Sequence, residues 1–188
     1  MRRILISGWG VSSSAMQGLA RAEDACVRWN DPIEFDEPVV LVGWSLGGVV
    51  ATELSHRPEV KGLITLCTPG HFQAQVNMKL FARLKRNLAK DPQSTLGGFF
   101  DWLLPDADRQ WMEPIELDAG LERLLESHCA AHWSTLGKPH LNVVADKDPL
   151  FQADSVASPS IHVKGDHQLP YCEVDAVRSV LDEFTHAL

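Results

Sequence analysis

The stretch VVLVGWSLGGVVATEL, residues 39–54, decides the fold class. Its first part is a run of apolar and β-branched residues, which is typical of a buried parallel strand, and its last part has apolar residues at helical spacing. Between them, residues 43–47 read G-W-S-L-G and fit the pattern G-x-S-x-G. Glycines are needed there because a strand that turns sharply into a helix leaves little room beside the serine. We expect Ser45 either to stand exposed as a nucleophile or only to cap the helix.

The same alternation of strand and helix continues along the chain. Apolar runs predict strands at residues 3–7, 24–29, 39–43, 62–67 and 140–145, with a weaker sixth at 160–164. Helical patterns cover residues 14–21, 46–55 and 174–184, and Pro170 suits the first turn of the last helix. This order predicts an α/β fold with a mostly parallel central sheet.

One long segment, residues 68–137, has helical patterns but no strand signal. Because the chain returns to a strand at residue 140, we interpret this segment as a helical lid inserted over the sheet's edge and not as a separate domain. The chain has 188 residues, of which 45% are hydrophobic and 22% charged, enough for one core. We expect a single domain, residues 1–188.

Composition and charge exclude several classes of protein. The formal net charge of -8 disfavours general nucleic-acid binding, which needs clustered Lys and Arg. No apolar stretch approaches the roughly 20 residues of a membrane span, and the first residues lack a signal-peptide pattern. The four cysteines form no C-x-x-C pair, so we expect neither a metal site nor a disulfide framework. We expect a cytoplasmic monomer.

A nucleophilic serine needs a base, and the base needs a carboxylate that orients it. For a serine on such a turn, the chain order is serine, acid, histidine. We expect His167, which follows the sixth predicted strand, to be the base. The acid is Asp148 or Asp146, and we favour Asp148, which lies further into its loop and precedes a proline, whereas Asp166 adjoins the histidine. Both loops follow parallel strands and should therefore flank Ser45.

The negative charge that develops during such an attack needs two N–H donors. The N–H of Leu46, at the start of the helix, is one candidate. The N–H of Trp9 is the other, because the SGWG sequence at residues 7–10 ends the first strand with two glycines that let the backbone approach a ligand. The alternative is a plain glycine-rich turn in which Trp9 only packs. No metal or organic cofactor is required.

Four short motifs together resemble the α/β-hydrolase superfamily: GWG at residues 8–10, GWSLGG at 43–48, ADKDPL at 145–150 and GDHQLP at 165–170. The pair GWG and GWSLGG is most similar to the pimeloyl-acyl-carrier-protein methyl ester esterases of biotin synthesis. The resemblance implies a compact α/β-hydrolase fold. It also implies the same roles as the argument above, with Ser45 as nucleophile, Asp148 as acid, His167 as base, and Trp9 and Leu46 as oxyanion donors.

The chain departs from the family pattern in three ways. Ser7 stands where the family usually has histidine, and Ala145 stands where a strand-ending glycine is usual. The chain is also shorter than most members, and we expect it to lack the first two strands and much of the lid. The first departure leaves the chemistry intact because that histidine is not in the triad. The shortness affects substrate size and specificity.

A predicted helix in the lid, NMKLFARLKRNLAK at residues 77–90, has one basic face. At 100° per residue, Lys79, Arg83, Arg86 and Lys90 share this face, and the opposite side carries Leu80, Phe81, Leu84 and Leu88. In an acidic protein this local reversal of sign suits an acidic macromolecule. Acyl carrier proteins are acidic and present a phosphopantetheine arm, so a basic lid helix would dock the carrier. The alternatives are an ordinary solvated face or a membrane-surface helix.

The apolar FFDWLL segment, residues 99–104, and Trp111 either line an acyl channel or form the core under the lid. We expect a serine carboxylesterase that hydrolyses the methyl ester of pimeloyl-acyl carrier protein. The alternatives are a thioesterase or small-ester carboxylesterase of the same fold, or a non-catalytic binding module that keeps the hydrolase scaffold.

Overall fold

The central sheet has six strands, all parallel, in the order β2-β1-β3-β4-β5-β6. The computed structural model describes residues 1–150 and 159–188. The strands are β1 (Arg2–Ile6), β2 (Ala25–Val27), β3 (Val39–Trp44), β4 (Val60–Leu66), β5 (His140–Ala145) and β6 (Ser160–Val163). All six predicted strands are present, so the predicted α/β class is confirmed. Because the strands are parallel, the turns after β1, β3, β5 and β6 all emerge at the carboxyl end of the sheet.

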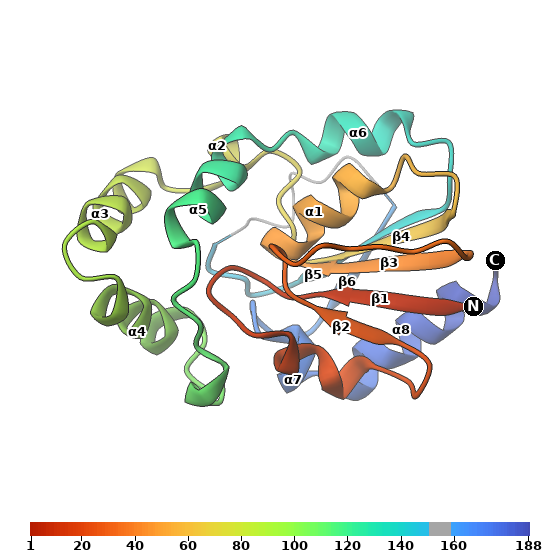
Figure 1. The fold of residues 1–188 in the computed structure, drawn as a ribbon, viewed down its shortest axis with the longest axis horizontal. Helices are drawn as coiled ribbons and strands as arrows, with labels where there is room; N and C mark the ends of the chain where they lie inside the picture. Colours follow the sequence, from red (N-terminus) through yellow and green to blue (C-terminus); the bar gives the residue numbers. More distant parts are fainter. Residues whose placement is uncertain (151–158) are drawn as a thin grey trace.

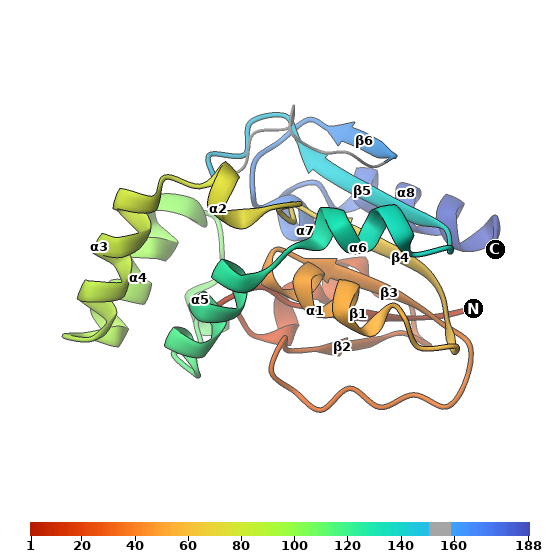
Figure 2. The same ribbon diagram turned by 90° about the horizontal axis from the view of Figure 1, so that it is seen from above.

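Helices cover both faces of the sheet (Figures 1 and 2). On one face lie α1 (Leu46–Leu54) and α6 (Cys129–Thr135); on the other lie the 3₁₀ helix η1 (Ser13–Leu19), α7 (Leu169–Cys172) and α8 (Val174–His186). The helix predicted at residues 14–21 is therefore of the 3₁₀ type. Pro170 lies in the first turn of the separate short helix α7, so its predicted place in the first turn of the last helix is wrong.

A buried arginine connects the first strand to both ends of the fold. Arg3 on β1 is fully buried, and its guanidinium donates hydrogen bonds to Asp24, just before β2, and to Asp182 on α8. Burial alone would raise the pKa of Asp24, but hydrogen bonds from Arg3 and from the Arg21 N–H outweigh it and lower the pKa below the ordinary value. The ion pair thus holds one edge of the sheet against α8.

The segment between β4 and β5 forms only helices in the described chain, apart from one isolated bridge between Met112 and Val11. In order they are α2 (Phe72–Gln75), α3 (Met78–Leu88), α4 (Pro92–Leu103), the 3₁₀ helix η2 (Arg109–Trp111), α5 (Leu117–Glu126) and α6. The side chain of Asn77 accepts hydrogen bonds at the start of α3, and Asp91 does the same for α4, where Pro92 occupies the first turn. These caps explain why two separate helices form here.

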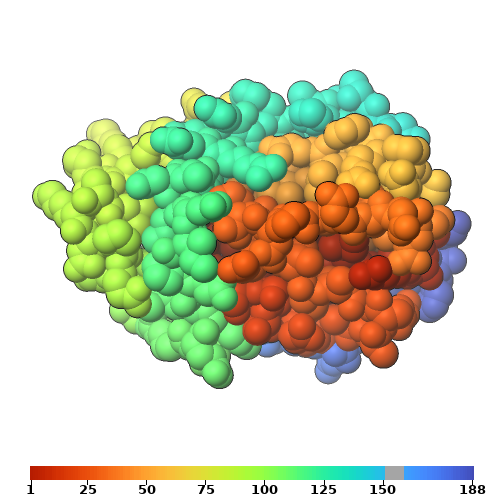
Figure 3. All heavy atoms as spheres, in the orientation of Figure 1, coloured from red at the N-terminus to blue at the C-terminus, as the bar shows by residue number. Residues whose placement is uncertain are grey.

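The helices α3, α4 and α5 lie beyond the carboxyl ends of the strands (Figure 1). In the space-filling view, α3 and α4 form a lobe beside the body of the protein, and α5 joins the two (Figure 3). The inserted helices therefore stand over the end of the sheet where the predicted catalytic loops emerge. None of the helices in residues 1–150 and 159–188 has the length and apolar character that a bilayer crossing needs.

Candidate active site

Ser45 occupies the turn between β3 and α1 with an unusual backbone conformation, φ 54° and ψ -118°. Non-glycine residues rarely adopt positive φ, so the conformation is strained. It is held by hydrogen bonds from the Ser45 N–H to the Leu66 carbonyl and from the Gly48 N–H to the Ser45 carbonyl, both 2.9 Å long. Within the described residues the Ser45 side chain does not cap α1, which argues against the capping interpretation.

The glycines around Ser45 are required by close contacts between backbone segments. A Cβ on Gly43 would lie 2.3 Å from the Gly47 carbonyl oxygen, and a Cβ on Gly47 would lie 2.2 Å from the carbonyl oxygen of Ile6. Real Cβ atoms do not approach other atoms so closely, and backbone cannot move aside cheaply. The glycines let β3, α1 and the end of β1 pack tightly, which brings Ser45 next to the turn after β1.

His167 and Asp148 form a buried pair. The Nδ1 atom of His167 lies 2.7 Å from Oδ2 of Asp148, and their side chains are only 3% and 1% exposed. The other two candidate acids have different partners: Asp146 accepts a hydrogen bond from the Gly165 N–H, and Asp166 accepts one from the Gln168 N–H. Of the three acids, Asp148 is the one that the structure brings to the imidazole.

Trp44 connects this pair to the serine, a contact that the sequence did not reveal. Its indole N–H donates a 2.9 Å hydrogen bond to the backbone carbonyl of His167, and the two rings lie 5.7 Å apart between centroids. Trp44 immediately precedes Ser45 in the chain and is almost fully buried. It therefore holds the His167 loop beside the turn that carries the serine. In the sequence, Trp44 stood out only as the first x of the G-x-S-x-G pattern, a position that any residue can occupy.

The thiol of Cys67 is a second feature of the site that sequence reasoning missed. The Sγ atom of Cys67, a carboxylate oxygen of Asp148 and a ring nitrogen of His167 lie within 4.8 Å of one another. Burial, reinforced by the charge of Asp148, raises the pKa of the Cys67 thiol well above its ordinary value. A protonated thiol is a poor metal ligand. The protonated thiol therefore favours the expectation that no metal binds here, which stays a prediction.

The two predicted oxyanion donors lie on turns that meet at Ser45. A Cβ placed on Gly8 would lie 3.4 Å from the Ser45 Cβ, so the turn that carries Trp9 touches the serine. Among the described residues, the backbone N–H groups of Trp9 and Leu46 donate no hydrogen bond. The Trp9 side chain is occupied, since its indole donates to the Leu117 carbonyl at 2.8 Å and its ring packs on Phe99. Both backbone donors are thus available to a ligand.

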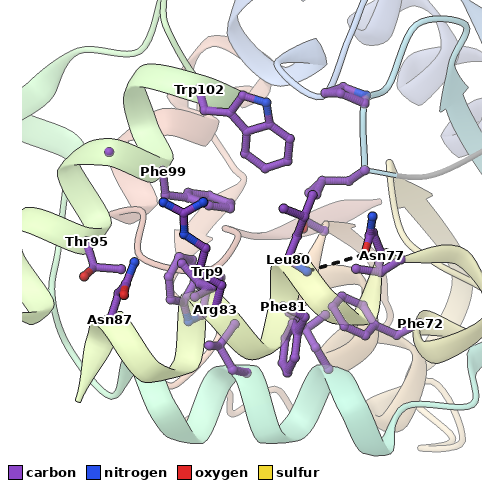
Figure 4. Close-up of a pocket in the computed structure, with 18 of the residues that line it drawn as sticks. Trp9, Phe72, Asn77, Leu80, Phe81, Arg83, Asn87, Thr95, Phe99 and Trp102 are labelled. Atoms are coloured by element: carbon purple, nitrogen blue, oxygen red, sulfur yellow. Dashed lines mark hydrogen bonds between the residues drawn. The ribbon is translucent and has the colours of Figure 1, made fainter. Parts of the chain in front are cut away.

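A cavity of about 770 Å³ extends from Ser45 into the inserted helices (Figure 4). Its walls are mostly apolar and come from the turn after β1, from α3, α4 and α5, and from the loop after β5. The FFDWLL segment divides between the two roles considered for it: Phe99 and Trp102 line the cavity, whereas Phe100 is buried in the core. Trp111 does not line it and packs on Tyr171 with ring centroids 5.3 Å apart.

The basic face of α3 is exposed. Lys79, Arg83 and Arg86 lie on α3, whereas Lys90 follows the end of this helix at Leu88, so the predicted helix over 77–90 is slightly too long. All four side chains are exposed, and none of them forms an ion pair with another described residue. Arg83 and Lys90 line the cavity, whereas Lys85, elsewhere on the helix, pairs with Glu122. On the predicted apolar side, Leu80, Phe81 and Leu84 all line the cavity. Phe81 and Leu88 are buried in the core and Leu84 is half-buried, whereas Leu80 is 53% exposed, so the prediction that it packs inward is wrong.

The six-stranded parallel sheet and the strained serine at a strand-to-helix turn together define the α/β class of hydrolytic enzymes. The model of the alpha/beta hydrolase family matches residues 5–177, and the chain belongs to this family. It is therefore a hydrolase, and the resemblance noted in the sequence is confirmed.

Curated relatives and solved structures agree with this assignment. The chain is 26% identical to a pimeloyl-[acyl-carrier protein] methyl ester esterase of Aeromonas hydrophila subsp. hydrophila, over 81% of this chain and 79% of that protein. It is 28% identical to the enzyme of the same name from Edwardsiella ictaluri, over 72% of this chain and 64% of that protein. The structure of a hydrolase from Oleispira antarctica is similar with a TM-score of 0.79 at 11% identity, covering 98% of this chain and 90% of that one. The last similarity shows the shared fold.

Proposed function

We propose that this hydrolase is a serine esterase in which Ser45, His167 and Asp148 form the catalytic triad. The observation that carries the proposal is the buried contact of 2.7 Å between His167 and Asp148, at the end of the sheet where Ser45 stands. An imidazole held in this way has a fixed orientation and a fixed tautomer: its proton is on Nδ1, and Nε2 is the nitrogen that takes the serine proton.

The reaction follows from these positions. His167 Nε2 takes the proton of the Ser45 hydroxyl while the serine oxygen attacks the ester carbonyl. The N–H groups of Trp9 and Leu46 hold the negative charge that develops on the carbonyl oxygen. The alcohol leaves with the proton from His167, and a water molecule activated by the same imidazole then releases the acid from Ser45. No cofactor takes part in these steps.

The substrate that we propose is the methyl ester of pimeloyl-acyl carrier protein. The cavity supports this assignment, because its apolar walls suit an acyl chain and its volume lies in the range of about 300 to 1,000 Å³ that ligand pockets have. The exposed basic face of α3 suits an acidic carrier, and two relatives carry the name of this activity. In this proposal residues 68–137 are the lid of a single domain, and Lys79, Arg83, Arg86 and Lys90 dock the carrier.

The experiment compares two substrates with wild-type protein and with Ser45→Ala. We expect the wild type to hydrolyse the methyl pimeloyl carrier with a kcat/KM at least about tenfold above that for p-nitrophenyl butyrate, a difference of about 1.4 kcal/mol in transition-state binding. We expect a fluorophosphonate probe to label the wild type and not Ser45→Ala. Wild-type protein that fails to react with the probe would be a binding module and not an enzyme.

The same assay separates the two enzymatic alternatives. A methyl esterase releases methanol and leaves the carrier thiol acylated. A thioesterase would instead release the free thiol of the carrier, which a thiol reagent detects. Preference for p-nitrophenyl butyrate over the carrier substrate would indicate a small-ester carboxylesterase.

A further inference from the structure

Two glycines in the middle of α4 have no structural reason to be glycine. A glycine inside a helix costs roughly 0.5 to 1 kcal/mol of stability relative to alanine. Gly97 and Gly98 are not among the residues with positive φ, and a Cβ on either one would meet no atom within 4 Å. Neither backbone conformation nor packing therefore requires them. Gly98, but not Gly97, lines the cavity, so its missing side chain keeps a passage open there.

Two polar side chains line the same cavity as Gly98. Asn87 on α3 and Thr95 on α4 line the cavity, and Figure 4 shows them together at one end of it, with Phe72 and Phe81 toward the other. Within residues 1–150 and 159–188, the side chains of Asn87 and Thr95 make no hydrogen bond. Asn77 and Asp91, which also line the cavity, are occupied as helix caps.

The cavity thus has two parts of different chemistry. Its lining includes the apolar side chains of Pro149, Leu150 and Phe72, which suit a hydrocarbon chain, and Figure 4 shows Phe72 away from Asn87 and Thr95. The part at the turn between α3 and α4 combines Asn87 and Thr95 with the cationic side chains of Arg83 and Lys90. A simple fatty chain has no group that could pair with these polar atoms, and contact with it would remove water from them at a cost.

We propose that the passage across Gly98 binds the amide-bearing arm of the carrier. This inference rests on the proposed function and assigns the arm its own site. Asn87 and Thr95 can each donate and accept a hydrogen bond, which is what an amide group requires. Arg83 and Lys90 match the phosphate group at the end of such an arm. The arm is a slender chain and fits beside Gly98, where a larger residue would narrow the passage.

The test uses three thioesters of the same methyl pimeloyl chain: with 4′-phosphopantetheine, with pantetheine, and with ethanethiol, which has no amide. The measured quantity is the ratio of kcat/KM between them. We expect the wild type to prefer the pantetheine ester over the ethanethiol ester by about tenfold or more, and Gly98→Leu to lose most of that preference. Gly97→Leu, one position away and outside the cavity, is the matched control and should keep it.

Two further variants test the proposal independently, in case Gly98→Leu folds poorly. The pair Asn87→Ala and Thr95→Val should lower the preference for pantetheine over ethanethiol, and Arg83→Ala should lower the preference for the phosphorylated over the unphosphorylated arm. If the wild type prefers the carrier substrate but all these variants keep both preferences, the arm lies elsewhere and the inference is wrong. If the wild type shows no preference for the carrier at all, the proposed function itself fails.

Discussion

Nδ1 of His167 and Oδ2 of Asp148 lie 2.7 Å apart in a nearly water-free setting, while Asp146, only two residues earlier, bonds the backbone N–H of Gly165. We expect Asp148→Asn to lower kcat by roughly 10³ to 10⁴, because an amide can stabilise the wrong tautomer of the imidazole. Asp146→Asn is the control, since an amide oxygen can still accept the Gly165 N–H. Steady-state kinetics on p-nitrophenyl butyrate measure both. Equal losses in the two variants would contradict the assignment of Asp148.

The exposed cations of α3 predict a dependence on charge and salt. Lys79→Glu combined with Arg86→Glu should lower the ratio of kcat/KM for the carrier ester to that for p-nitrophenyl butyrate by about tenfold at low salt, and by less at high salt, because salt screens exposed charges. Lys61→Glu changes an exposed lysine near the amino end of β4 and serves as the control. If the double variant and the control behave alike at every salt concentration, the carrier docks on another surface.

The glycines of the fold predict opposite changes in stability. Gly47→Ala should destabilise the protein by more than about 1 kcal/mol, because its Cβ would lie 2.2 Å from the Ile6 carbonyl oxygen. Gly97→Ala should stabilise it by roughly 0.5 to 1 kcal/mol, because the new methyl group meets nothing and the helix gains propensity. Urea unfolding of both variants measures the difference. A destabilised Gly97→Ala would show that this glycine has a packing role.

Burial of His140 predicts a loss of stability in mild acid. Its ring stacks on Trp133 with centroids 4.8 Å apart, and burial lowers its pKa from 6.5 to about 4. Between these two values the unfolded chain binds a proton that the folded chain does not bind, so the free energy of unfolding falls as the pH falls. From pH 6.5 to pH 4 this loss amounts to about 3 kcal/mol.

The variant His140→Gln should remove this part of the pH dependence. We expect its free energy of unfolding to change less between pH 6.5 and pH 4.5 than that of the wild type, measured by urea titration at each pH. His162→Gln, which replaces an exposed histidine on the neighbouring strand, should retain the wild-type slope. A wild-type slope in His140→Gln would assign the acid sensitivity to another group.

The strands and the serine turn were predictable because their signal is local. Within a few residues, the β-branched runs predict strands β3 and β4, and the glycines around Ser45 predict the sharp turn. The contacts of Trp44 and Cys67 were not predictable, since each depends on a loop about 100 residues further along the chain. Leu80 was misplaced for a similar reason: helical periodicity gives the direction of a side chain, but only the neighbouring helix α4 decides whether that direction faces core or cavity.

The positive φ of Ser45 has a consequence for any attempt to improve this protein by selection. A glycine at position 45 would relieve a conformation that costs roughly 1 to 3 kcal/mol, while it removes the hydroxyl. In the proposed mechanism this hydroxyl is the nucleophile, so a library screened only for thermal tolerance or for yield would enrich inactive clones at this codon. Directed evolution of this hydrolase has to score turnover in every round, because at this position robustness and catalysis favour different residues.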